Sequence, residues 1–155
     1  MLGSTPPSRQ RLVYDRGMRL HKDAKIDLIS RVPLLAGCSK KELGMIANLA
    51  DLIERPEGRT LIKEGELGSE FFILVDGTVR VSRSGRKLRD LVAGDWAGEI
   101  ALIANVPRTA TVVTTSPLRA LVLTRGGFSD LIEDVPSIAA NVLAALGERL
   151  APETI

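Results

Sequence analysis

The sequence predicts a mainly β fold with flanking α-helices: an antiparallel, jelly-roll-like β-roll with an N-terminal helix before it and two C-terminal helices after it. Two observations lead to this fold class. Glycines punctuate short apolar runs between residues 58 and 98, which is typical of a small antiparallel β structure. After Leu123 the spacing of apolar residues becomes helical. The length of 155 residues fits one domain with short additions at its ends.

The N-terminal part of the chain predicts a tail and then helices. Residues 1–10 are rich in Ser, Thr and Pro, a composition that buries too little apolar surface to offset its conformational entropy. Ser39 and Glu42 form a capping-box pattern, which predicts a helix at about 40–50. The expected division of the chain is a flexible tail at 1–10, a helical extension at 11–31, the principal domain at 32–150 and a C-terminal tail at 151–155.

Two turn signals organise the first predicted strands. Strands at 71–75 and 78–82 flank Asp76-Gly77, a dipeptide that readily takes the positive φ values of a tight hairpin turn. Ser84-Gly85 predicts a second turn of the same kind. With the later segments, seven or eight short strands are expected to close into a roll.

The remaining elements follow in the C-terminal half. Residues 109–114 and 118–123 are predicted strands because they are rich in β-branched and aliphatic side chains. A helical apolar stripe runs over 128–135. Ser137 is the predicted N-cap of a last helix that ends near Leu150.

The composition excludes several classes of protein. No apolar run approaches the roughly 20 residues of a membrane-spanning helix, and the N-terminus lacks a secretory signal, so a cytoplasmic location and no membrane contact are expected. Cys38 is the only cysteine and His21 the only histidine, so neither a disulfide, a histidine metal site nor a catalytic triad is expected. Cys38 is interpreted as a small buried hydrophobe. The net charge of +2 does not by itself indicate nucleic acid.

The stretch GDWAGEIALIANVPRTATV, residues 94–112, has the features of a site for an anion and a sugar. Gly98 allows close approach of the backbone, and Glu99 follows as an acceptor at the start of a short helical turn whose N–H groups favour negative charge. Arg108 has a planar guanidinium that can bind two phosphate oxygens at once. The alternative from these residues alone is a solvated surface ion pair without function.

The same stretch resembles the phosphate-binding cassette of cyclic nucleotide-binding domains, the family of catabolite activator protein and of the regulatory subunits of cyclic-AMP-dependent protein kinase. The segments Gly98-Glu99-Ile100-Ala101-Leu102 and Pro107-Arg108-Thr109-Ala110-Thr111-Val112 match the cassette pattern. The resemblance covers about residues 32–150. One departure is Ala97, where relatives usually carry Phe, with Trp96 one position earlier.

The resemblance implies a role for each matching residue. Glu99 would accept a hydrogen bond from the ribose 2′-hydroxyl, Arg108 would pair with the cyclic phosphate, and Thr109 stands where a hydroxyl contacts guanine in cyclic-GMP-binding relatives. The backbone N–H groups expected to complete the phosphate cradle are those of Gly98, Ile100, Ala101 and Ala110. The last helix would close over the base, with Arg149 stacking on it. The ligand implied is cyclic AMP or cyclic GMP, with no other cofactor and no metal.

The resulting hypothesis is a regulatory sensor, not an enzyme: nucleotide binds in the roll and the flanking helices move. Only five residues follow Leu150, too few for a helix-turn-helix, so this chain alone is not expected to bind nucleic acid. The alternative is a ligand-sensing fragment of a larger transcription regulator, channel or enzyme. The protein partner is unknown, and a homodimer is left open.

Overall fold

The computed structural model describes residues 20–150, except for the side chains of residues 149 and 150. The strands are β1 Asp51–Arg55, β2 Thr60–Ile62, β3 Glu70–Asp76, β4 Val79–Arg83, β5 Arg86–Leu91, β6 Trp96–Ala97, β7 Thr111–Thr114 and β8 Leu118–Thr124. The helices are α2 Lys22–Ser30, α3 Lys40–Leu49, α4 Arg125–Asp134 and α5 Pro136–Leu150, with short 3-10 turns η3 Pro33–Leu35 and η4 Glu99–Leu102. The predicted tails at 1–10 and 151–155, and residues 11–19 of the predicted extension, lie outside the described residues.

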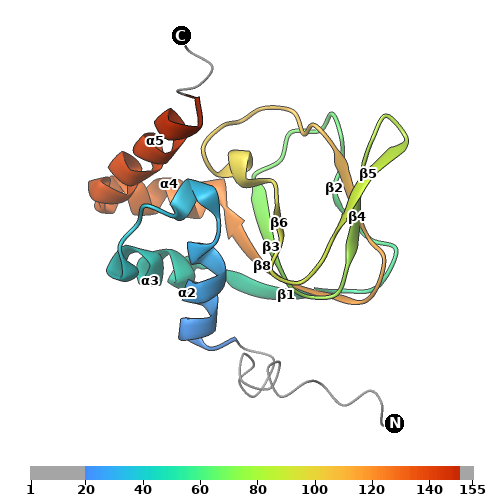
Figure 1. Ribbon diagram of the computed structural model, residues 1–155, viewed down its shortest axis with the longest axis horizontal. Helices are drawn as coiled ribbons and strands as arrows, with labels where there is room; N and C mark the ends of the chain where they lie inside the picture. The colour runs from blue at the N-terminus through green and yellow to red at the C-terminus, as the bar shows by residue number, and fades with distance from the viewer. Residues whose placement is uncertain (1–19, 151–155) are drawn as a thin grey trace.

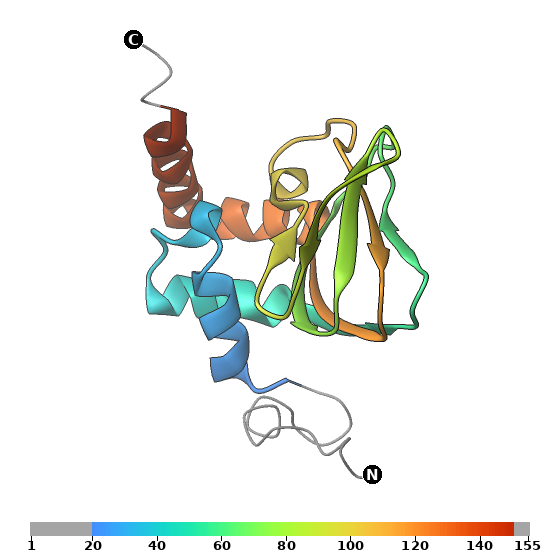
Figure 2. The ribbon, with the colours of Figure 1, turned by 45° about the vertical axis from the view of Figure 1, so that its right-hand side comes forward.

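The strands form two four-stranded antiparallel sheets, in the orders β1-β8-β3-β6 and β2-β7-β4-β5. The sheets face each other as a roll on one side of the molecule, and the helices gather on the other side against the first sheet (Figures 1 and 2). The predicted fold class is confirmed: a mainly β roll with helices before and after it.

The sheet β1-β8-β3-β6 separates two hydrophobic cores. Phe71 and Ile73 of β3 belong to the core shared with the helices, whereas Phe72 and Leu74 belong to the core inside the roll. All four side chains are at most 4% exposed. Successive side chains of a strand point to opposite faces, so a strand buried on both faces is a continuous apolar run.

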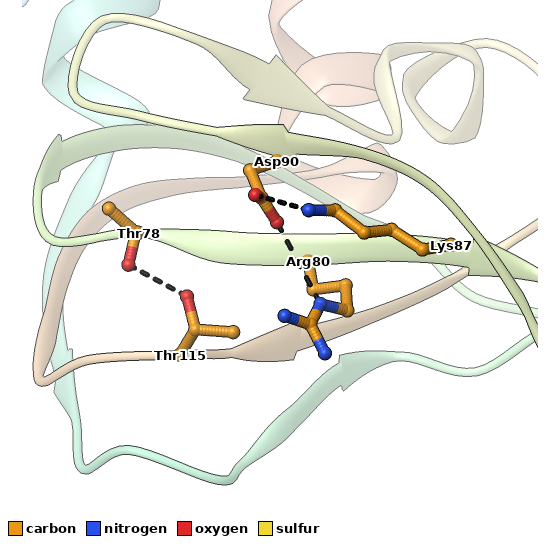
Figure 3. A network of polar contacts seen from close by, with 5 residues as sticks. All are labelled: Thr78, Arg80, Lys87, Asp90 and Thr115. Carbon is orange, nitrogen blue, oxygen red and sulfur yellow. Dashed lines mark hydrogen bonds and ion pairs between the residues drawn. The ribbon is translucent and has the colours of Figure 1, made fainter.

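The predicted turn at Ser84-Gly85 joins β4 and β5 as a hairpin, with Arg83 opposite Arg86 and positive φ at both turn residues. On the outer surface of this pair, the Asp90 carboxylate lies 2.7 Å from Lys87 Nζ and 3.8 Å from Arg80 Nε (Figure 3). The hydrogen bond from Lys87 is the main cause that lowers the pKa of Asp90 from its ordinary value. The hairpin is thus supported by cross-strand charges as well as by its turn.

The hairpin predicted at Asp76-Gly77 is wrong. Gly77 does turn the chain, with φ +98°, but β3 pairs with β8 and β6 while β4 pairs with β5 and β7. The turn therefore carries the chain from one sheet to the other. A Cβ on Gly77 would lie 2.3 Å from the carbonyl oxygen of Pro117, so this corner requires glycine for close contact as well as for its φ. Beside the corner, the hydroxyls of Thr78 and Thr115 lie 2.7 Å apart (Figure 3).

The capping box predicts the start of α3 correctly: Glu42 N donates to Ser39 Oγ at 3.1 Å and Ser39 N to Glu42 Oε1 at 2.7 Å. The predicted N-cap role of Ser137 is wrong, because α5 already begins at Pro136. Ser137 instead donates its hydroxyl to Glu42 Oε2, and Asn141 Nδ2 donates to Glu42 Oε1 at 2.9 Å. One carboxylate therefore caps α3 and also binds the first turns of α5.

The last two helices, α4 and α5, lie on the same side of the roll as α2 and α3, and α5 packs against α4 and η3 (Figure 2). Phe128 of α4 and Ile138 of α5 are fully buried, so both helices belong to the main core. Within the described residues, no helix has the length and apolar character needed to cross a membrane.

Candidate functional site

A cavity of about 220 Å³ opens between the strands of the roll and the segment that follows β6. Its lining residues are Ile62, Val81, Arg83, Leu88, Arg89, Leu91, Trp96, Ala97, Gly98, Glu99, Arg108, Thr109, Ala110 and Val112. Four aliphatic residues of the lining belong to the core inside the roll: Ile62, Val81, Leu91 and Val112. Arg83 and Arg89 of the lining are exposed. Such a mixture of apolar walls and a few polar groups is typical of a small-molecule site.

The predicted turn after Gly98 is present as η4, and Gly98 has a left-handed φ of +85°. Glu99 is the first residue of η4, lines the cavity and has its Oε2 atom buried. The buried Leu102 at the end of the turn anchors it in the helical core. The sequence therefore presents one carboxylate to the cavity from a turn that is fixed at both ends.

Arg108 lies against two glycines. A Cβ on Gly68 would be 2.4 Å from Arg108 Nε, and a Cβ on Gly98 would be 2.7 Å from Arg108 Nη1. Arg108 Nη2 donates to the carbonyl oxygen of Glu70 at 2.6 Å. The guanidinium therefore occupies a slot that only residues without side chains leave open, at the edge of the cavity.

The backbone on either side of Arg108 is paired with the loop between β2 and β3. Gly65 N donates to Arg108 O at 2.8 Å, Arg108 N donates to Glu66 O at 2.9 Å, and Leu67 bridges Pro107. These bonds fix the direction in which the Arg108 side chain leaves the backbone. The orientation of the guanidinium thus follows from ladder-like pairing that the loop sequence alone does not reveal.

The charge of Arg108 is only partly solvated. Burial lowers the pKa of its guanidinium from the ordinary value; the nearby Glu70 carboxylate raises it and the Arg125 cation lowers it further. An anion that binds here would stabilise the Arg108 cation, because its charge-assisted hydrogen bonds would replace the hydration that the guanidinium has lost by burial.

The structure brings most of the predicted site residues together. Gly98, Glu99, Arg108, Thr109 and Ala110 all line the cavity. The two predicted residues of the turn differ from these: the Ile100 side chain is 41% exposed, and Ala101 N donates to Gly98 O at 3.0 Å within η4. In this structure the Ala101 amide is therefore engaged in the turn.

The expected cap on the base is not part of the described cavity lining, which contains no residue of α5. The Arg149 side chain lies outside the described residues, so its stacking role stays a prediction. Trp96 both packs against the helical core and lines the cavity.

Three residues near the site were not predicted from the sequence. Arg83 and Arg89 line the cavity from β4 and β5, and Arg83 Nε donates to Thr109 O at 2.7 Å. Gly68 supports Arg108. Charged residues at exposed strand positions are usually solvated, and only their place beside the cavity distinguishes these two arginines. Among residues 20–150, no group of three or more His, Cys, Asp or Glu side chains could hold a metal ion.

Comparison with protein families finds that residues 52–135 match the model described as the cyclic nucleotide-binding domain. Among curated proteins, a cyclic-AMP-dependent protein kinase regulatory subunit of Mycosarcoma maydis is 31% identical, with 95% of this chain and 26% of the relative covered. A cyclic-GMP-dependent protein kinase of Caenorhabditis briggsae is 29% identical, with 83% of this chain and 18% of that protein covered. The chain therefore spans about a quarter or less of these relatives.

Solved structures give the same picture. Catabolite activator protein of Thermus thermophilus superposes with a TM-score of 0.62 at 28% identity, with 78% of this chain and 59% of that chain covered. The regulatory domain of Toxoplasma gondii PKA, determined with cyclic AMP, superposes with a TM-score of 0.63 at 25% identity, with 79% and 49% covered.

Proposed function

Because this chain belongs to the family of cyclic nucleotide-binding domains, we propose that its cavity holds a cyclic purine nucleotide. Arg108 pairs with the cyclic phosphate and Glu99 accepts a hydrogen bond from the ribose 2′-hydroxyl. The observation that carries the proposal is the Arg108 guanidinium held against Gly98 at the edge of a cavity that Glu99 also lines. One fixed cation and one fixed carboxylate match one phosphate and one neighbouring hydroxyl.

Guanine suits the remaining wall of the cavity better than adenine. Arg89 and Thr109 line the same cavity as Glu99 and Arg108. An arginine donates two parallel hydrogen bonds to guanine O6 and N7, whereas adenine presents an amino donor in place of O6. We therefore propose a preference for cyclic GMP over cyclic AMP, with Arg89 and Thr109 as the residues that read the base.

Nucleotide binding is proposed to act as a signal and not as the first step of a reaction. Within residues 20–150, the cavity lining contains one carboxylate, Glu99, and no histidine or cysteine, so it offers no nucleophile paired with a histidine. Binding is instead coupled to movement of α4 and α5, which alters the affinity for a partner protein or for a second copy of the chain. The chain is proposed to work in the cytoplasm, alone or as the sensing part of a larger regulator.

Titration calorimetry with cyclic AMP and cyclic GMP tests the proposal. Arg108→Ala is expected to weaken binding roughly 30- to several-thousand-fold, since loss of a partly buried charged contact costs about 2–5 kcal/mol. The matched control is Arg31→Ala, which removes an exposed arginine that directly follows α2 and pairs with Asp27. Arg89→Ala is expected to lower the affinity for cyclic GMP more than the affinity for cyclic AMP.

Three results contradict separate parts of the proposal. Equal affinity of Arg108→Ala and the unaltered chain contradicts the phosphate assignment. Equal losses for both nucleotides in Arg89→Ala contradict the assignment of base recognition. Conversion of either nucleotide to its open monophosphate during incubation contradicts a purely regulatory role.

A further inference from the structure

Arg125 begins α4 and turns its guanidinium back toward the segments that form the nucleotide site. Its Nη1 atom lies 3.2 Å from the carbonyl oxygens of Gly68 and Ala101 and 3.3 Å from that of Ala104. Its Nη2 atom lies 3.3 Å from Asn105 Oδ1. The Arg125 amide also donates to Ser69 O at 2.8 Å. One residue thus binds two segments that are distant in sequence.

Each of these segments holds part of the nucleotide site. Gly68 is the glycine against which Arg108 lies, and Ala101 belongs to the turn η4 that begins at Glu99. Asn105 lies in the loop that leads from η4 to Arg108. Arg125 itself is not among the residues that line the cavity. It therefore contacts the supports of both ligand-binding side chains without standing where the ligand would be.

The chemistry of arginine suits this position. The carbonyl groups at the end of a helical turn have no partners within the turn, and a cationic side chain satisfies them well. Lysine carries the same charge but lacks the planar fork that reaches several acceptors in fixed directions. Four acceptors around one guanidinium also mean that a shift of η4 or of the Gly68 loop alters the bonds of the residue from which α4 starts.

We propose that Arg125 is a positioning residue that couples the nucleotide site to α4. It holds η4 and the Gly68 loop in a fixed position relative to each other, and it moves α4 when the ligand displaces either of them. This inference rests on the proposed function, since it concerns the output of the same site. Arg125 does not bind the nucleotide, so its loss separates binding from the response of the helix.

The experiment compares amide hydrogen exchange with and without saturating cyclic GMP, and affinity by calorimetry, in the unaltered chain and in four variants. Arg125→Met removes all donors at similar length, Arg125→Lys keeps the charge, and Asn105→Ala removes one acceptor on an exposed loop. Arg31→Met is the control at an exposed arginine that directly follows α2.

In Arg125→Met, we expect affinity to fall about tenfold, because η4 and the Gly68 loop then hold Glu99 and Arg108 less firmly. Ligand is expected still to slow exchange in η4 but no longer in α4. Arg125→Lys and Asn105→Ala are expected to keep part of the response in α4, and Arg31→Met all of it. A stable fold is checked by thermal melting, and if Arg125→Met does not fold, the other two variants decide.

The inference is overturned if ligand changes exchange in α4 equally in the unaltered chain, Arg125→Lys and Asn105→Ala. It is also overturned if the Met variant folds and keeps the full response of α4. If the unaltered chain binds neither nucleotide, the proposed function is wrong and this inference is wrong with it.

Discussion

Gly68→Ala isolates the placement of Arg108 from the rest of the fold. The new Cβ would lie 2.4 Å from Arg108 Nε, 2.7 Å from Nη2 and 2.8 Å from Cζ, whereas ordinary contacts begin at 3.4 Å. The guanidinium must therefore retreat by about 1 Å, because it is the flexible end of its side chain. Gly68 has no left-handed φ, so alanine itself fits the backbone there. The free energy of unfolding is expected to change by less than about 1 kcal/mol.

A displaced guanidinium cannot keep two aligned hydrogen bonds to a phosphate, so we expect affinity for cyclic nucleotide to fall roughly 10- to 100-fold, about 1.4–2.8 kcal/mol. The control is Gly126→Ala in α4, where nothing lies within 4 Å of the added Cβ. That variant is expected to bind normally. Calorimetry measures affinity, and denaturant unfolding measures stability. If Gly68→Ala binds within twofold of the unaltered chain, Arg108 does not bind the ligand from the position described.

Three further predictions concern single groups. Glu99→Gln is expected to lower the affinity for cyclic GMP, measured by calorimetry, and to change the affinity for its 2′-deoxy analogue little. Equal losses of affinity for the two ligands would show that Glu99 has a structural role instead. The Ser137 hydroxyl, and after it the Ser39 amide, hold the pKa of Glu42 below its ordinary value. The ionised Glu42 carboxylate therefore stabilises the fold at pH values above the ordinary carboxyl pKa, and this stabilisation is lost as the pH falls through the lowered pKa. Glu42→Gln should therefore unfold more easily than the unaltered chain at pH 7 in denaturant, and the difference should shrink in acid. Burial, together with Glu42, raises the pKa of Cys38 to about 11, so iodoacetamide at pH 8 should modify it far more slowly in the native chain than in denaturant.

The sequence predicts the fold well where the signal is local. The Ser39 and Glu42 pattern defines the start of α3 because both groups lie within one turn. The Asp76-Gly77 signal correctly indicates a turn, but it does not indicate which strands pair. β3 is buried on both faces and pairs with β6 and β8, which come much later in the sequence than β4. Ser137 looks like an N-cap, yet its hydroxyl binds Glu42, 95 positions earlier. Contacts at such separations leave no local pattern.

The same distinction applies to the candidate site. Glu99 and Arg108 are predicted because both belong to one contiguous motif with recognisable chemistry. Arg125 is not, because its bond to Gly68 spans 57 positions and its neighbours Gly126 and Gly127 resemble an ordinary helix start. Arg89 is missed for a similar reason: on an exposed strand, an arginine indicates solvent until the cavity beside it is known.

The sheet β1-β8-β3-β6 divides the buried side chains of the molecule into two cores that share the strand β3. In β3 the residues alternate strictly, with Phe71 and Ile73 in one core and Phe72 and Leu74 in the other. Substitutions at one set of positions can thus alter the core beneath the helices while the side chains that face the inside of the roll stay unchanged. Lengthening this strand by one residue would exchange the two sets beyond the insertion. The side chains on the two faces of β3 can therefore vary separately, whereas a change in the alternation of this strand affects both cores at once.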